Sequence, residues 1–263
     1  MMDPETAIWL ALGLFGAAIG SFLNVVIHRV PLGESVVRPR SRCPICRREI
    51  PWYENLPVLS WAFLLGRCRG CGMSISIRYP FVEAMTAALA VTLFAQHGPT
   101  LLFVTSFAFA CALLAVAYID LDHQIIPDRI SLPGIVVGLA ASAAQGLPVL
   151  TDAILGVLLG GGLLLAVAYG YEWIAGREGM GGGDVKFLAM IGAFLGWKGV
   201  LLTLLLGSLL GSVIGMVLMV SRGADRRLAI PFGPFLSLGA LVTLLWGPEV
   251  VAWYISYAGI HIP

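Results

Sequence analysis

Two aspartates stand where long apolar runs meet short polar loops. Asp120 ends the apolar run that begins at Leu101, and Asp184 follows three glycines and precedes another apolar run. An ionisable side chain at membrane depth is energetically costly, which makes each aspartate a functional candidate. Two carboxylates on one side of a bilayer are typical of acid–base chemistry on a peptide bond. Either aspartate taken alone is explained equally well as a residue that caps a loop.

The chemistry of such a pair follows from its charge. Two carboxylates held within a few ångströms cannot both stay ionised, so they share one proton. The ionised group takes a proton from water, the other hydrogen-bonds the carbonyl of the bond to be cut, and the roles reverse as the amine leaves. Gly181 and Gly183 favour a site of this kind, because glycine lets a substrate strand approach closely and adopts conformations closed to other residues. Asp122 could orient Asp120 or act on it by like-charge repulsion.

The elements that would position these residues are membrane helices. Of the 263 residues, 59% are apolar and only 12% are charged, whereas a soluble domain carries about 25% charged residues. A helix that crosses a bilayer needs roughly 20 mostly apolar residues. We therefore predict an all-α polytopic membrane protein with about eight transmembrane helices, the first of which is a retained span because it has no cleavage site. The runs lie at about residues 7–27, 80–96, 100–119, 132–148, 152–172, 185–197, 199–220 and 232–256.

The basic residues predict the orientation of these spans. With eight spans, 15 of the 16 Lys and Arg residues fall in odd-numbered loops, and only Lys198 lies on the opposite side. Positive charge stays cytoplasmic, so both termini are expected in the periplasm and Asp120 and Asp184 on the cytoplasmic face. The net charge of +1, without a basic patch interleaved with aromatic residues, gives no indication of nucleic-acid binding.

Four cysteines form two C-x-x-C pairs in the first cytoplasmic loop. The pairs, Cys43 with Cys46 and Cys68 with Cys71, are separated by 21 residues, a spacing close to the zinc-ribbon pattern. Neighbouring arginines help to keep thiolates ionised. A pair of disulfides is the alternative, but cytoplasmic thiols stay reduced. We predict a structural Zn²⁺ site, because a metal would fold a loop that has too little apolar mass to fold alone.

Three further polar side chains lie near these features. Asp128 follows a proline and is interpreted as the cap of the helix that follows it. His123 lies beside the Asp120 segment and is interpreted as solvating the loop. Glu83, just inside the second apolar run, is interpreted as a partner of Arg78, with contact to substrate as the alternative.

Five segments, in this order and spacing, resemble the bacterial type IV prepilin peptidases, which are membrane aspartic proteases of the GxGD class. The match extends along most of the chain. The segments are GSFLNVVIHRVP (20–31), CPIC with CRGC (43–71), IRYPFVEAMTA (77–87), IDLDHQIIPDRISLP (119–133) and GMGGGDVKFLAMIGAFLG (179–196).

The resemblance implies that Asp120 and Asp184 are the catalytic pair of an inner-membrane enzyme. It implies that the substrates are type IV prepilins and pilin-like secretion proteins, whose basic leader is removed at the cytoplasmic membrane face. It also implies N-methylation of the new N-terminus with S-adenosylmethionine, for which the sequence identifies no binding residues. The expected organisation is a first span at 1–28, a cytoplasmic zinc-binding loop at 29–79 and a multi-span peptidase core at 80–263.

Three other functions fit parts of this pattern. A related GxGD protease of the preflagellin type would have another substrate, but the complete zinc module argues against it. A transporter could use the two aspartates to relay protons, although transport sites lie near the midplane of the bilayer. A scaffold protein could use the cysteine loop to bind a partner.

Overall fold

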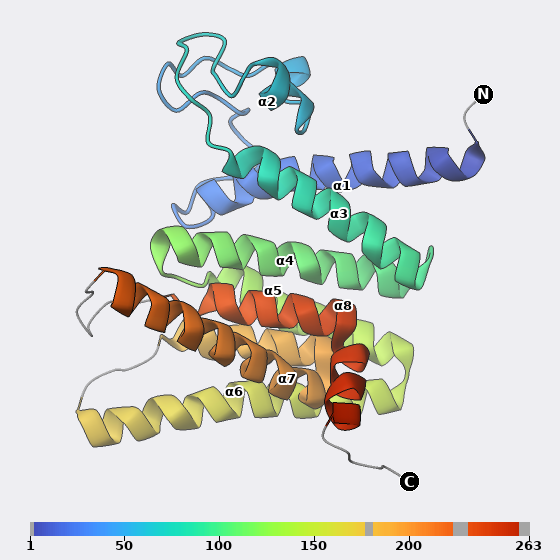
Figure 1. Cartoon of the computed structure of the whole chain (residues 1–263), viewed down its shortest axis with the longest axis vertical. Coiled ribbons are helices and arrows are strands. Elements are labelled where there is room, and N and C mark those ends of the chain that lie inside the picture. The colour runs from blue at the N-terminus through green and yellow to red at the C-terminus, as the bar shows by residue number, and fades with distance from the viewer. Residues whose placement is uncertain (1–2, 177–180, 223–230, 258–263) are drawn as a thin grey trace. The chain divides into compact units, whose positions relative to one another are not determined.

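The computed structural model describes residues 3–176, 181–222 and 231–257, and their regular secondary structure is helical apart from two isolated β-bridges (Figure 1). The predicted all-α class is therefore confirmed. Three of the arginines counted for the orientation, Arg177, Arg226 and Arg227, and the first two residues of the segment 179–196 lie outside the described ranges. The elements are α1 (Pro4–Arg29), η1 (Trp52–Glu54), α2 (Leu59–Phe63), α3 (Arg78–His97), α4 (Leu101–His123), α5 (Asp128–Gln145), α6 (Leu147–Ala175), α7 (Gly182–Arg222) and α8 (Gly233–Tyr257).

The long helices have the length and composition of a multi-pass membrane protein. Five of those in the described part of the chain are long and apolar enough to cross a bilayer, namely α1, α4, α6, α7 and α8. All eight predicted runs are helical, and the sixth and seventh merge into the single helix α7. The helices α3 and α5 do not reach the length and apolar composition needed to cross a bilayer. Large apolar side chains such as Trp173 and Ile174 are exposed on α6, as expected of a lipid-facing helix.

The chain forms two compact units, residues 1–115 and 116–263, with the boundary inside α4. In the first unit α1 and α3 lie side by side (Figure 1). Gly16 and Gly20 make this possible, because a Cβ at either position would lie only 2.7 Å or 2.6 Å from the Cα atoms of Ala87 and Glu83. Small residues of this kind let membrane helices pack at close range. The three-part division predicted from the sequence stays a prediction.

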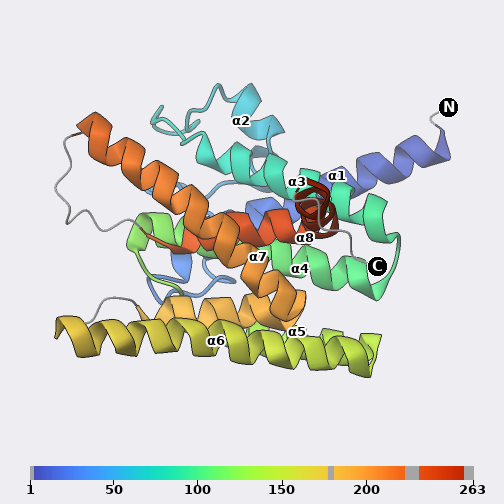
Figure 2. The ribbon, with the colours of Figure 1, turned by 60° about the horizontal axis from the view of Figure 1, so that its bottom comes forward.

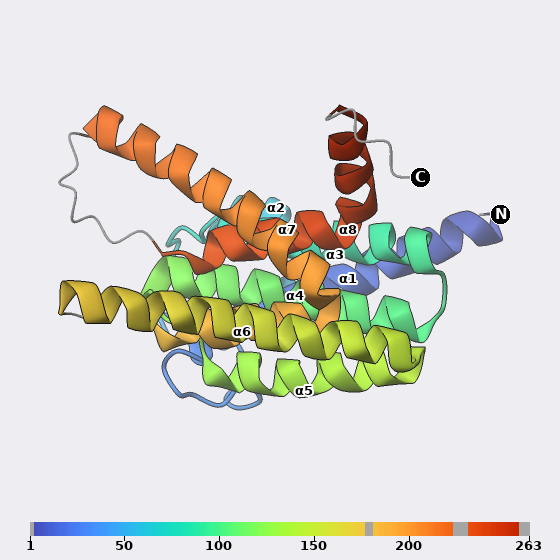
Figure 3. The same ribbon diagram turned by 90° about the horizontal axis from the view of Figure 1, so that it is seen from below.

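The second unit is built around the first half of α7. This half packs against α5 and α6 (Figures 2 and 3), whereas α8 contacts the second half, where Gly207 and Gly211 lie against Phe235. Phe187, Leu188, Met190 and Ile191 are completely buried here, so the helix that carries Asp184 forms the centre of its unit.

Two of the helices in this unit are bent. The backbone of α7 breaks at Gly196, whose φ of 69° is one that glycine adopts without strain. The break separates the predicted sixth and seventh runs, and the second half of α7 leaves at an angle (Figure 3). In α8 the bend falls at Trp246, two residues before Pro248, because a proline ring clashes with the preceding turn and cannot complete its hydrogen bond.

Candidate active site and cysteine cluster

Asp120 lies in the last turn of α4 and is buried, with 5% of its surface exposed. Its Oδ2 accepts a hydrogen bond of 2.9 Å from the backbone N–H of Gly233, the first residue of α8. The chain places this residue at the end of a helix because Gln124 then turns the backbone with a φ of 54°. The carboxylate is therefore fixed by a main-chain donor from a segment more than a hundred residues away in the sequence.

Asp184 lies in the first turn of α7, where its carboxyl group interacts electrostatically with that of Asp120. The two carboxylates that the sequence selected thus belong to the same compact unit and act on each other electrostatically. The Oδ1 atom of Asp184 is buried and finds no hydrogen-bond partner among the described residues. A buried carboxylate oxygen without a partner is unusual in a native fold and is typical of a site where a ligand or a proton is handled.

The glycines before Asp184 have one clear steric role. A Cβ on Gly183 would lie 3.0 Å from the Cβ of Ile126, so this glycine lets the segment after Asp120 approach the start of α7. Among the residues that the structure describes, a Cβ on Gly181 would meet only Asp184 Oδ2, at 3.8 Å. The supporting role predicted for Gly181 and Gly183 stays a prediction. Asp122 is exposed, and its supporting role stays a prediction.

Asp128 was expected to cap the helix that follows it, and the structure shows that it does not. Pro127 occupies the N-cap position of α5 without a side-chain capping bond. The carboxylate of Asp128 instead accepts two hydrogen bonds from Lys186 Nζ, at 2.8 Å and 2.7 Å. Asp128 begins the helix that follows Asp120, and Lys186 lies two residues after Asp184. The ion pair therefore joins the segment after one candidate catalytic residue to the segment that contains the other.

The four cysteines of the predicted metal site come together. Their Sγ atoms all lie within 4.8 Å of one another, with 3.8 Å between Cys43 and Cys71 and 4.0 Å between Cys46 and Cys68. Sulfur atoms in a tetrahedral zinc site with bonds of about 2.3 Å stand about 3.8 Å apart. The cluster can hold a metal ion.

Two similar turns build this cluster. In the first, the N–H of Cys43 donates to the carbonyl of Arg48, and in the second the N–H of Cys68 donates to that of Met73. Each turn has a positive φ four residues after its first cysteine, 57° at Arg47 and 73° at Gly72. Backbone N–H groups in the first turn, chiefly that of Cys46, lower the pKa of the Cys43 thiol to about 6, which favours the thiolate that binds metals.

Glu54 connects the two turns. Its Oε1 lies 2.9 Å from Arg48 Nη2 and 3.4 Å from Arg69 Nη1, so one carboxylate pairs with an arginine from each turn. The hydrogen bond from Arg48 is the main cause that lowers the pKa of Glu54. Arg48 and Arg69, which were expected to help keep the thiolates ionised, therefore also join the two halves of the loop.

Glu83 has partners that the sequence did not indicate. It is buried at the interface of α1 and α3, where its Oε2 accepts a hydrogen bond of 2.7 Å from the N–H of Val58, and its carboxyl group is also hydrogen-bonded to the side chain of Ser21. Val58 has a φ of 61°, which is rare for a β-branched residue. Glu83 thus anchors the cysteine-containing loop to the two helices that flank it.

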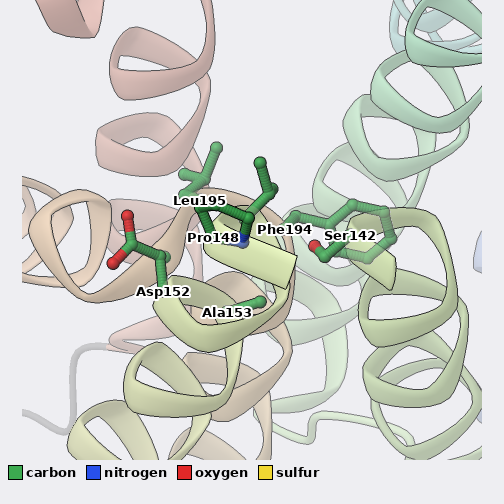
Figure 4. Close-up of a pocket in the computed structure, with 8 residues that line it drawn as sticks. Ser142, Pro148, Asp152, Ala153, Phe194 and Leu195 are labelled. Carbon is green, nitrogen blue, oxygen red and sulfur yellow. The ribbon is translucent and has the colours of Figure 1, made fainter. Parts of the chain in front are cut away.

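The second unit also contains a pocket that is separate from Asp120 and Asp184. Figure 4 shows it where the end of α5, the start of α6 and the bend of α7 meet, and neither Asp120 nor Asp184 lines it. Its lining includes Ser142, Pro148, Asp152, Phe194 and Gly196.

Comparisons with known proteins agree with these features. Residues 14–97 match the model of the bacterial peptidase A24 N-terminal domain, and residues 107–216 match that of the type IV leader peptidase family. Each of three curated relatives carries the name prepilin leader peptidase/N-methyltransferase. The relative from Aeromonas salmonicida is 38% identical over 92% of both chains. The one from Pseudomonas aeruginosa is 38% identical over 94% of this chain and 93% of its own.

The third relative, from Stutzerimonas stutzeri, is 37% identical over 97% of this chain and 96% of its own. No solved structure matches the chain. Identity at this level along nearly the whole length of several relatives establishes the family. The chain belongs to the type IV leader peptidase family, as a prepilin leader peptidase/N-methyltransferase.

Proposed function

We propose that this protein removes the basic leader of type IV prepilins and pilin-like secretion proteins by acid–base catalysis with Asp120 and Asp184. The observation that carries the proposal is the electrostatic interaction of two carboxyl groups at helix ends, one of them with a buried oxygen that has no partner among the described residues. Family membership supports the same reaction.

Two carboxyl groups that share one proton are suited to water attack on a peptide bond. One carboxylate is ionised and takes a proton from the attacking water, while the protonated one donates a hydrogen bond to the scissile carbonyl. As the amine leaves, the proton moves to it and the pair returns to its starting state. The buried surroundings of Asp120 strengthen each of these electrostatic interactions by excluding water.

The proposed topology brings the substrate to this site. With both termini in the periplasm, Asp120 and Asp184 face the cytoplasm at the edge of the inner membrane. A prepilin is itself a membrane helix preceded by a basic leader, so its scissile bond lies at the same depth. Lipid surrounds both helices there, and no nucleic acid takes part.

The cysteine cluster is proposed to hold a structural Zn²⁺. All four ligand positions of a tetrahedral site are filled by thiolates of Cys43, Cys46, Cys68 and Cys71, which leaves no open position for a substrate or water. The ion's contribution is to fold residues 29–79, as structural zinc does in other small modules.

The second proposed step is transfer of a methyl group from S-adenosylmethionine to the new N-terminus, in line with the full name of the relatives. The residues that bind the methyl donor are not assigned.

A direct experiment uses the purified protein in detergent with a prepilin substrate. Mass spectrometry is expected to show loss of the leader without any added cofactor, and a further gain of one methyl group when S-adenosylmethionine is added. An intact prepilin after incubation with folded protein of full metal content would contradict the proposal.

A further inference from the structure

The contact between Asp120 and Gly233 gives the two aspartates different surroundings. Gly233 is the first residue of α8, and the first N–H groups of a helix have no partner within the helix. One of these groups donates to Asp120 Oδ2 over 2.9 Å in a buried environment. A hydrogen bond from a backbone N–H favours the ionised form of a carboxyl group.

The surroundings of Asp184 stabilise a negative charge less than those of Asp120. Asp184 lies in the first turn of α7, but its Oδ1 is buried without a hydrogen-bond partner among the described residues. Burying an ionised carboxylate with an unsatisfied oxygen is costly, whereas a protonated carboxyl can donate its proton to a substrate carbonyl. The proton that the pair shares therefore resides on Asp184.

The fit at Gly233 leaves no room for a side chain. A Cβ there would lie 2.6 Å from Oδ2, 3.1 Å from Cγ and 3.2 Å from Cβ of Asp120. A Cβ contact of 2.6 Å is closer than real side chains show. Any other residue at position 233 must therefore move the carboxylate of Asp120 or push α8 away from it.

We propose that Gly233 is a positioning residue that holds Asp120 as the ionised member of the pair, so that Asp120 takes the proton from water and Asp184 donates to the scissile carbonyl. This inference rests on the proposed peptidase function and assigns each aspartate its first role in that reaction. The number of protons on the pair stays the same in this step. Asp120 takes one proton from water, and Asp184 passes one proton to the substrate oxygen.

The first test compares Gly233→Ala with Gly247→Ala in the same helix, where the added Cβ would lie 3.5 Å from Thr243, an ordinary contact distance. A displaced carboxylate is expected to lower kcat for leader removal about 100-fold. KM should change little, since substrate binding is not affected, and Gly247→Ala should behave as the wild type. Wild-type kcat in a folded Gly233→Ala protein would overturn the inference.

The second test measures thermal unfolding and does not depend on activity. Gly233→Ala is expected to lower Tm in the wild-type background and to lower it clearly less in an Asp120→Ala background, because the clashing carboxylate is then gone. Equal losses of Tm in both backgrounds would overturn the inference. If Gly233→Ala alone does not fold, recovery of folding in the double variant supports it and continued misfolding overturns it.

These results separate the inference from the function on which it rests. If the wild-type protein does not cut a prepilin, the proposed function fails even where the two substitutions are coupled in Tm. If the wild type cuts and Gly233→Ala cuts equally well, the inference alone fails.

Discussion

A carboxylate pair that shares one proton works only within a window of pH. At low pH both Asp120 and Asp184 are protonated and no base remains, whereas at high pH both are ionised and no acid remains. We expect the rate of leader removal to fall on both sides of an optimum. Initial rates of the detergent-solubilised enzyme across pH measure this, with its Tm at each pH as the control. A rate that keeps rising to high pH would indicate one deprotonated base instead.

The anchoring role of Glu83 gives a second expectation for a single residue. Glu83→Ala leaves the N–H of Val58 without its acceptor, which is expected to destabilise the protein by about 1–3 kcal/mol. Glu83→Gln keeps an acceptor oxygen and should lose less. Unfolding of both variants, with limited proteolysis between residues 51 and 66, tests the difference. Equal stability of Glu83→Ala and the wild type would contradict the anchoring role.

Sequence patterns single out residues whose type is costly in a membrane or whose spacing is unusual. Asp120 and Asp184 stood out because each is a charge beside an apolar run, and the cysteines stood out by their spacing. Gly233 was missed because its contribution is a backbone N–H, which every residue except proline offers. The partner of Glu83 was also missed, because a long-range contact with the backbone of Val58 leaves no pattern in the sequence.

The contact between α6 and α7 depends on two glycines. A Cβ on Gly192 would fall on the backbone carbonyl of Gly156, and the reverse is also true. Gly192→Ala is therefore expected to push the helices apart and to lower stability by about 1–3 kcal/mol, with a loss of activity because α7 carries Asp184. Gly162→Ala on α6, which has open space around it, is the control. Thermal unfolding and leader removal measure both effects, and wild-type values for Gly192→Ala would show that the helices can adjust.

The helices themselves were predicted well, and their ends less well. Apolar runs located every long helix, but the fourth run crossed a real boundary at Gly146, where a φ of 119° ends α5 before α6 begins. The only sign of the bend at Gly196 in the sequence was the short length of the sixth apolar run, which ends at residue 197. Glycine is common inside membrane helices, so its presence alone does not distinguish a packing contact from a break.

For the molecule as a whole, the metal and the carboxylates are expected to have separable roles. Removal of the metal by a chelator should increase protease cleavage within residues 29–79, because the loop loses the ligand bonds that fold it. The second unit contains both aspartates and should keep its protease resistance. Cys46→Ser is expected to reproduce the effect of the chelator. Unchanged cleavage of the loop after complete metal removal would rule out a structural ion.

The most direct test of the account is the rate of prepilin leader removal by Asp120→Asn and Asp184→Asn. Asparagine keeps the size of each side chain but can neither accept nor deliver the proton that the reaction requires. Each variant is predicted to lose at least about 100-fold in rate while its Tm and metal content stay at wild-type values. A rate close to that of the wild type in either variant would show that the two aspartates are not a catalytic pair.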